Sequence, residues 1–118
     1  MHNFKNIIAW QKARALVKEV YLLLKKFPKS ELHGLVSQIM RSVVSVPSNI
    51  AEGSGRTTGK EFSRFLDIAL ASSFEMETQL ILSYDLEYIT EQELKLISVK
   101  TDEVQKLIQG FKKSLKQE

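Results

Sequence analysis

Apolar residues recur alternately three and four positions apart along most of this chain, and this spacing sets the fold class. The clearest example is a seam in the last quarter of the sequence, formed by Leu94, Ile97, Thr101, Val104, Ile108, Phe111 and Leu115. Residues at this spacing fall on one side of an α-helix, so the pattern predicts an amphipathic helix that buries that side. Thr90 and Glu93 have the spacing of a capping box and mark the start of the helix.

Two segments in the first half carry the same pattern. The apolar positions of the first are Trp10, Ala13, Val17, Val20, Leu24 and Phe27. Pro28 ends this segment, and Ser30 is a good N-cap for the next one. The apolar positions of the second are Leu32, Leu35, Val36, Ile39, Met40, Val43, Val44 and Ile50. Pro47 falls inside this stripe, where we expect a kink near Ser45 and Val46, with a break of the helix as the alternative.

The glycine-rich residues 53–59 predict a loop, because glycine adopts turn conformations that other residues avoid. Thr58 and Glu61 then have capping-box spacing for a third helix that runs to about Glu87. This segment is apolar on more than one side, which is typical of a helix buried on more than one side. A single bundle would leave one of those sides exposed, so we expect the protein to form oligomers.

Four amphipathic segments predict an all-α fold. The connections at residues 28–30 and 88–90 are short, which makes consecutive helices antiparallel and favours one up-down-up-down four-helix bundle. A chain of 118 residues is the size of one domain, which we expect to cover residues 1–118. The apolar runs are too short to cross a membrane and the first six residues lack the apolar region of a signal peptide. We therefore expect a cytoplasmic protein with no membrane partner.

The sequence offers no group of residues typical of an active site. It has no cysteine, and its two histidines, His2 and His33, lie far from the acidic residues of the third segment, so no metal site is predicted. The glycine-rich loop fails the spacing of a phosphate-binding loop, because Ser54 replaces its first glycine and Glu61 its hydroxyl residue. No serine stands in a Gly-x-Ser-x-Gly elbow. We expect a protein that is not an enzyme and binds no cofactor.

The charge is divided unevenly along the chain. Residues 1–60 carry ten Lys or Arg and three Asp or Glu, a net charge of +7, whereas residues 61–118 carry seven and eleven, a net charge of −4. A basic surface attracts polyanions, and contacts with phosphates bind nucleic acid without reading its bases. The candidate phosphate-binding residues are Lys12, Arg14, Lys18, Lys25, Lys26 and Arg56. The alternative is that these side chains only solvate helix faces.

Polar residues of the second and third segments form another candidate site. Glu75 and Gln79 share a helical face with Ser72, and a partly buried Glu75 would need a partner such as Arg41. We interpret this set as a polar network that fixes the register of the bundle or a contact between subunits. Its members are Gln38, Arg41, Asn49, Glu52, Ser72, Glu75 and Gln79.

Residues 37–53 read Ser-Gln-Ile-Met-Arg-Ser-Val-Val-Ser-Val-Pro-Ser-Asn-Ile-Ala-Glu-Gly. This stretch resembles the four-helix bundle proteins encoded in 23S rRNA intervening sequences. The likeness extends over about residues 4–90, through Trp10-Gln11-Lys12-Ala13, Phe27-Pro28, Glu61-Phe62, Arg64-Phe65-Leu66, Ala69, Ser72 and the segment from Glu75 to Leu80. Met40 departs from the pattern of that family, in which we expect a second Arg or another polar residue at this position.

That family is similar to the accessory variability determinant of diversity-generating retroelements, a pentameric barrel that binds nucleic acid and a reverse transcriptase. The resemblance therefore implies a cyclic homo-oligomer, with a pentamer as the first expectation, and a role associated with RNA. The family is also labelled a ribosomal protein family. That label describes where such genes are found, inside rRNA genes, and does not establish a place in the ribosome. The alternative is a protein-interaction scaffold whose oligomeric surface binds a partner such as a reverse transcriptase.

Overall fold

A computed structural model describes residues 2–115 of the chain. Residues 1 and 116–118, which the predicted domain also includes, lie outside the described residues. The described part contains no strand, and its elements are η1 (Phe4–Asn6), α1 (Ile8–Leu24), η2 (Lys29–Glu31), α2 (Leu35–Ser54), α3 (Gly59–Asp85) and α4 (Glu91–Leu115). The prediction of an all-helical chain with four long helices is confirmed.

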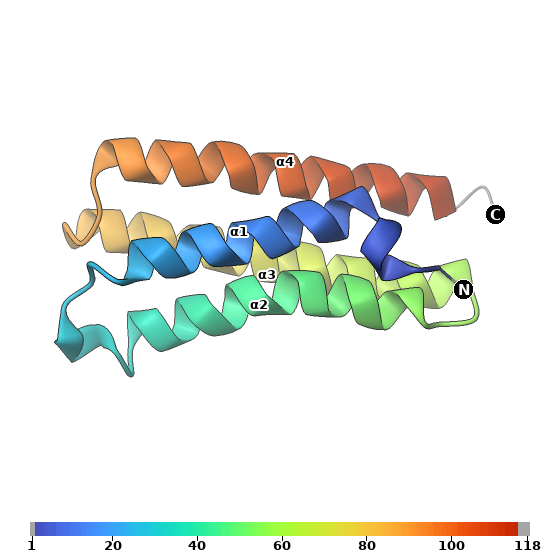
Figure 1. The fold of residues 1–118 in the computed structure, drawn as a ribbon, viewed down its shortest axis with the longest axis horizontal. Coiled ribbons are helices and arrows are strands. Elements are labelled where there is room, and N and C mark those ends of the chain that lie inside the picture. Colours follow the sequence, from blue (N-terminus) through green and yellow to red (C-terminus); the bar gives the residue numbers. More distant parts are fainter. Residues whose placement is uncertain (1, 116–118) are drawn as a thin grey trace.

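Each long helix contacts two of the other three. Within residues 2–115, the backbones of α1 and α3 both lie close to those of α2 and α4, whereas α1 and α3, like α2 and α4, face each other across the core. Figure 1 shows the four helices lying side by side, with the connections at alternate ends, and the molecule measures 46 × 25 × 19 Å. The first and last helices are therefore neighbours, although they lie far apart in the sequence.

One apolar core runs between the four helices. Its largest fully buried side chains are Phe62, Leu16, Ile39, Ile50, Leu66, Met76, Leu80, Ile108, Val20, Val43, Val46 and Val104. The seam predicted for α4 faces this core, with Leu94 and Phe111 at its partly buried edge. On α1 the predicted seam is narrower than the buried face, because Ala9 and Leu16 are also buried.

Two of the predicted helix starts have the predicted caps. At α4 the Glu93 backbone N–H donates to Thr90 Oγ1 (3.1 Å), and the Thr90 N–H donates to the Glu93 carboxylate (2.9 Å). At α3 the Glu61 N–H donates to Thr58 Oγ1 (3.1 Å). These side chains satisfy backbone donors that have no partner inside the helix.

The predicted start of the second helix was wrong. The residues after Pro28 form the short helix η2, and α2 begins only at Leu35, so Ser30 is not its N-cap. The Leu35 N–H instead donates to Glu31 Oε1 (3.1 Å), and Glu31 Oε2 accepts the Tyr88 hydroxyl (2.9 Å). The Glu31 carboxylate thus joins the start of α2 to the α3–α4 connection. Its hydrogen bond with the Tyr88 hydroxyl raises the pKa of Tyr88.

The second helix also settles the question of Pro47. α2 continues through this residue to Ser54, so the alternative of a broken helix is excluded. Proline removes one backbone donor and crowds the preceding turn. Val46 and Ile50 remain fully buried on either side of Pro47. Core packing therefore holds the segment helical despite the lost hydrogen bond.

The glycine-rich loop is shorter than predicted and uses glycine differently. Gly53 ends up inside α2 and Gly59 inside α3, and no glycine in the described chain has a positive φ. A Cβ at position 53 would stand 2.7 Å from Phe62 Cδ1 and 2.8 Å from Phe65 Cβ. Glycine is needed there because α3 approaches the α2 backbone too closely for a side chain.

We predict that Gly53→Ala lowers the free energy of unfolding by about 1–3 kcal/mol, because the added methyl overpacks the contact with α3. The matched control is Gly110→Ala, since a Cβ there has no neighbour within 4 Å. That change should raise stability by about 0.5–1 kcal/mol, because alanine favours a helix more than glycine does. Urea unfolding of both variants measures the effects, and equal effects of the two substitutions would contradict the account of Gly53.

Candidate nucleic-acid interface

The charged residues on one side of α1 are paired with α4. The pairs are Lys12 with Glu103 (3.7 Å), Lys26 with Glu93 (2.7 Å) and Lys100 with Glu19. Lys12 and Glu19 lie on α1, and Lys26 follows its last residue. Their spacing of seven residues places all three on one side of the segment. This side faces α4, and its ion pairs span the seam between the first and last helices.

Pairing with α4 compensates two of the predicted phosphate-binding cations. The Lys26 ammonium lowers the pKa of the Glu93 carboxyl, and the hydrogen bond from the Thr90 N–H lowers it further. Glu93 is therefore ionised at neutral pH and cancels much of the field of Lys26. Lys12 faces the carboxylate of Glu103 in the same way. A phosphate would have to compete with these carboxylates.

The other cations of this segment lie on a different side of it, two on α1 and one at its C-cap, Lys25. Arg14, Lys18 and Lys25 are exposed, and their spacings of four and seven residues place them on one face. None of the three forms an ion pair with any described residue. The Arg14 guanidinium lies over the Trp10 ring, 5.7 Å from its centroid. We call Arg14, Lys18 and Lys25 the basic face, because no carboxylate among the described residues pairs with them.

Trp10 lies beside this face, where the Arg14 guanidinium covers its ring, whereas Arg56 lies outside it. Trp10 is half-buried and meets the ring of Phe4 edge-on at 5.1 Å, in line with its predicted place in the apolar seam. Arg56 follows α2 at one end of the molecule, where it pairs with Glu52 (3.4 Å) and lies 4.5 Å from the centroid of the Phe65 ring. The structure thus brings together three of the six predicted cations and separates the others.

Part of the predicted polar network lies between α2 and α3. Ser42 Oγ donates to Gln79 Oε1 (2.8 Å), and the hydroxyls of Ser45 and Ser72 are 2.8 Å apart. Asn49 Nδ2 donates to the Ser45 carbonyl (2.8 Å) and to its hydroxyl (2.9 Å). Asn49, Ser72 and Gln79 were predicted, whereas the two serines of α2 were missed. The Ser42–Gln79 and Ser45–Ser72 bonds fix the register of the two helices, whereas the Asn49 bonds lie within α2.

The remaining members of the predicted network lie on the surface. Gln38, Arg41, Glu52 and Glu75 are exposed, and no ion pair joins Arg41 to Glu75 among residues 2–115. The expectation of a partly buried Glu75 held by Arg41 is therefore wrong for the single chain. The reason is that the core-facing position between Ser72 and Gln79 is taken by Met76, which is fully buried.

A second polar contact, between α3 and α4, was not predicted. The amide of Gln105 donates to Ser73 Oγ and to Glu77 Oε1, both at 3.2 Å. Ser73 and Gln105 are buried although they are polar. Their position in the helical repeat could have predicted their burial, because each lies beside an apolar core position. A buried polar group needs a hydrogen-bond partner, so a contact between them would follow.

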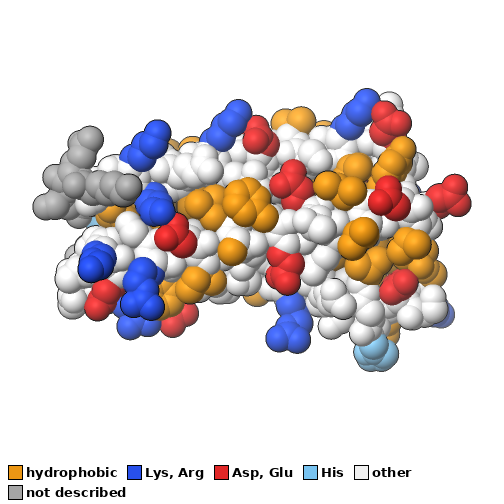
Figure 2. All heavy atoms as spheres, turned by 180° about the vertical axis from the view of Figure 1, so that it is seen from behind, with side chains coloured by type: hydrophobic (Ala, Val, Ile, Leu, Met, Phe, Trp, Pro, Cys, Tyr) orange, Lys and Arg blue, Asp and Glu red, His pale blue; other side chains and the backbone are white. Residues whose placement is uncertain are grey.

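The apolar surface predicted for the third helix is present. Five large side chains of α3 and the residue after it have about half of their surface exposed (45–53%), namely Ile68, Phe74, Ile81, Leu82 and Leu86. Figure 2 shows apolar side chains in patches along this side of the molecule, with carboxylates among them, a group of Lys and Arg at one end and further Lys or Arg along the edges. A single chain leaves this surface in water, and large exposed apolar patches are typical of interaction sites.

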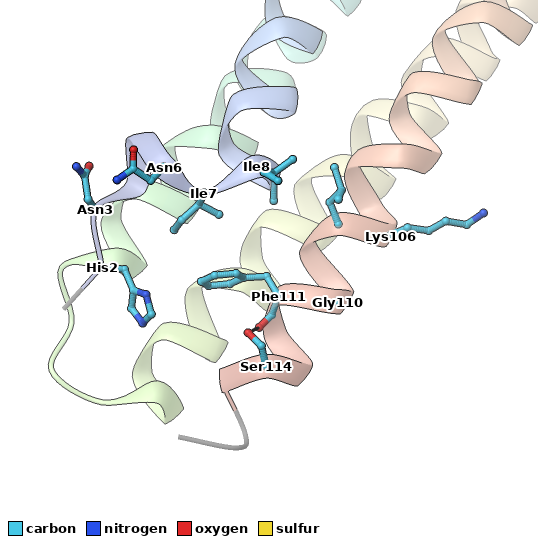
Figure 3. Close-up of a pocket in the computed structure, with 11 residues that line it drawn as sticks. His2, Asn3, Asn6, Ile7, Ile8, Lys106, Gly110, Phe111 and Ser114 are labelled. Atoms are coloured by element: carbon cyan, nitrogen blue, oxygen red, sulfur yellow. Dashed lines mark hydrogen bonds between the residues drawn. The ribbon is translucent and has the colours of Figure 1, made fainter.

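An open hollow of about 590 Å³ lies between the N-terminal residues and the end of α4. Figure 3 shows His2 lying toward Phe111, with the Lys106 side chain directed away. The His2 ring meets Phe62 and Phe111 edge-on at 5.4 and 5.6 Å. His2 and Lys106 are the titratable groups among its lining residues. Nowhere in residues 2–115 do three His, Asp or Glu residues gather that could hold a metal ion.

Four amphipathic helices around one core, with polar contacts between neighbouring helices, define a helical-bundle protein. The family of 23S rRNA-intervening sequence proteins matches residues 5–110, and the chain belongs to this family, as its sequence resemblance predicted. No curated protein matches the sequence. In the described part of the chain, no helix is both long and apolar enough to cross a membrane.

The chain is also similar to a solved structure from Bacteroides thetaiotaomicron. That protein is described as one of unknown function from the S23 ribosomal protein family. The two share 28% sequence identity with a TM-score of 0.80, over 90% of this chain and 96% of the other. The shared fold therefore extends over nearly the whole length of both proteins.

We predict that Ser42→Ala lowers the free energy of unfolding by about 1–2 kcal/mol, because it leaves the Gln79 oxygen buried without its donor. The matched control is Ser48→Ala, the same substitution at an exposed residue of the same helix. Glu75→Ala should change the unfolding of the single chain by less than about 0.5 kcal/mol, as is usual for surface residues. Denaturant melts measured below the concentration of any assembly test these values. A loss at Glu75 as large as that at Ser42 would contradict the assignment.

Proposed function

We propose that the chain is an up-down-up-down, antiparallel four-helix bundle that forms a homo-oligomer and binds RNA phosphates without catalysing a reaction. The observation that carries the proposal is the basic face, where Arg14, Lys18 and Lys25 lie together with no carboxylate partner among the described residues. Membership of a family named for the intervening sequence of 23S rRNA supports RNA as the polyanion. The proposal implies a cytoplasmic setting, because ribosomal RNA would be met there.

Assembly would make weak phosphate contacts effective. The basic face of a single chain offers three cations, and three phosphate contacts bind weakly at physiological salt. Identical faces held in one particle act at a raised effective concentration and bind more tightly without any new contact. The exposed apolar surface of α3 is the proposed contact between copies. A closed ring, with a pentamer as the specific expectation from the family resemblance, would repeat the basic face around its axis.

We predict that replacing Arg14, Lys18 and Lys25 together with Gln lowers affinity for RNA of any sequence and reduces the slope of log affinity against log salt. The matched control is the double variant Lys12→Gln and Lys26→Gln, which removes cations of the same segment that already pair with Glu103 and Glu93. The control should lose less affinity per charge removed. Filter binding or fluorescence anisotropy at several salt concentrations measures both, after circular dichroism has shown that helicity is unchanged.

Equal losses per charge in the two variants would contradict the distinction between paired and uncompensated cations. If the parent protein shows no RNA binding at about 50 mM salt, where phosphate contacts are strongest, RNA binding itself is wrong.

Assembly is tested separately at the surface of α3. We predict that Phe74→Glu combined with Ile81→Glu converts the oligomer into a monomer, because burying a carboxylate in an apolar contact is costly. Val99→Glu, at a still more exposed apolar residue of α4, is the control and should leave the assembly intact. Multi-angle light scattering at micromolar concentration gives the mass. A monomeric parent would refute the oligomer, and a monomeric Val99 variant would refute the assignment of the contact to α3.

The second candidate function is a protein-interaction scaffold. The same exposed apolar residues of α3 favour it, since they would bind a different protein as well as another copy. This candidate replaces the first if the parent assembles but binds no RNA. A reverse transcriptase encoded beside the gene would identify the partner to test by co-purification.

A further inference from the structure

Tyr21 lies within the basic face. It follows Lys18 by three residues and precedes Lys25 by four, and these spacings place all three on one face of α1. Its side chain is 37% exposed. Within the described chain the ring has no aromatic or cationic partner, and its hydroxyl has no hydrogen bond. An exposed aromatic ring thus stands between uncompensated cations.

Most other aromatic residues have ring contacts. Phe4 meets Trp10, Phe27 meets Tyr88, Phe62 meets Phe111, and Phe65 lies under the Arg56 guanidinium. The other rings without such a partner in residues 2–115 are Phe74 and Tyr84. Both lie on α3, which carries more acidic than basic residues. Tyr84 also has a cation near it, Lys95, but Tyr21 is the one such ring that lies on the basic face.

Cations and an exposed ring on one face suit a single strand of nucleic acid. Proteins that bind single strands combine positive charges for the backbone with aromatic rings on which bases stack. Arg14 and Lys25 are eleven residues apart, or about 16 Å along the helix at 1.5 Å per residue. Phosphates on both sides of one base would then meet cations while the base meets the ring. A duplex keeps its bases stacked on one another, so it has no free base face to offer Tyr21.

We propose that Tyr21 is a stacking platform for an unpaired base, and that the ligand of the basic face is single-stranded RNA. The inference rests on the proposed RNA-binding function and specifies its ligand. Arg14, Lys18 and Lys25 hold the phosphates, and Tyr21 selects an unpaired segment over a duplex. Stacking tolerates every base, so the preference is for strandedness and not for sequence.

The test compares Tyr21→Leu with Tyr21→Phe. Leucine keeps an apolar side chain but removes the ring, whereas phenylalanine keeps the ring and removes only the hydroxyl. The matched control is Tyr84→Leu, because Tyr84 has the same exposed fraction, 37%, and lies next to Asp85. Each variant is titrated with a mixed-sequence RNA oligonucleotide and with an RNA duplex of the same length, at several salt concentrations.

Tyr21→Leu should lower affinity for the single strand by about five- to a hundredfold and leave duplex affinity and the salt slope unchanged, because it removes stacking and no charge. Tyr21→Phe and Tyr84→Leu should bind as the parent does. Ultraviolet cross-linking of the parent to single-stranded RNA provides a readout that needs no variant, and the cross-linked peptide should contain Tyr21.

The outcomes separate the two proposals. Unchanged single-strand binding by Tyr21→Leu, or cross-links that avoid residue 21, would overturn the stacking platform while the phosphate contacts stand. Equal losses for single strand and duplex would also overturn it, because they indicate a general role in the face. A parent that binds neither RNA at low salt would refute the proposed function itself.

Discussion

The close packing of α2 against α3 is the contact on which the rest of the bundle depends. Gly53 lets the Phe62 and Phe65 side chains reach the α2 backbone, and the Ser42–Gln79 bond fixes the register farther along. One close approach and one buried hydrogen bond define how the two helices slide and rotate relative to each other. α1 and α4 then pack on the outside of this pair, each against one of its helices and against each other.

The α1–α4 seam is built differently, and this difference shapes the surface. Ion pairs span it along its length, from Lys12 and Glu103 to Lys26 and Glu93. Exposed pairs of this kind contribute little to stability. Their larger effect is on the charge of α1, because carboxylates of α4 compensate the cations on one side and leave Arg14 and Lys18 uncompensated on another. The geometry of the bundle thus decides which lysines are available to a polyanion.

The fold could be predicted from the sequence wherever the signal is local. The seam of α4 and its capping box at Thr90 and Glu93 depend on residues a few positions apart, and both were predicted correctly. The start of α2 was wrong because Ser30 has the residue type of a cap, while the cap in the structure is a Glu31 side chain acting from outside the helix. The role of Gly53 was wrong because the cause lies in another helix.

The candidate site depends even more on contacts between residues that are far apart in the sequence. Sequence reasoning found that α1 is basic, but it could not divide its cations, because the carboxylate that pairs with Lys26 is 67 residues away. It also could not single out Tyr21, whose position among the cations matters only once their pairing is known. The spacing of Arg14, Lys18, Tyr21 and Lys25 was visible throughout as one helical face. That face is distinct because Lys12 and Lys26 pair with carboxylates of α4, whereas the cations of the face do not. The candidate site therefore follows from tertiary contacts and not from the number of lysines.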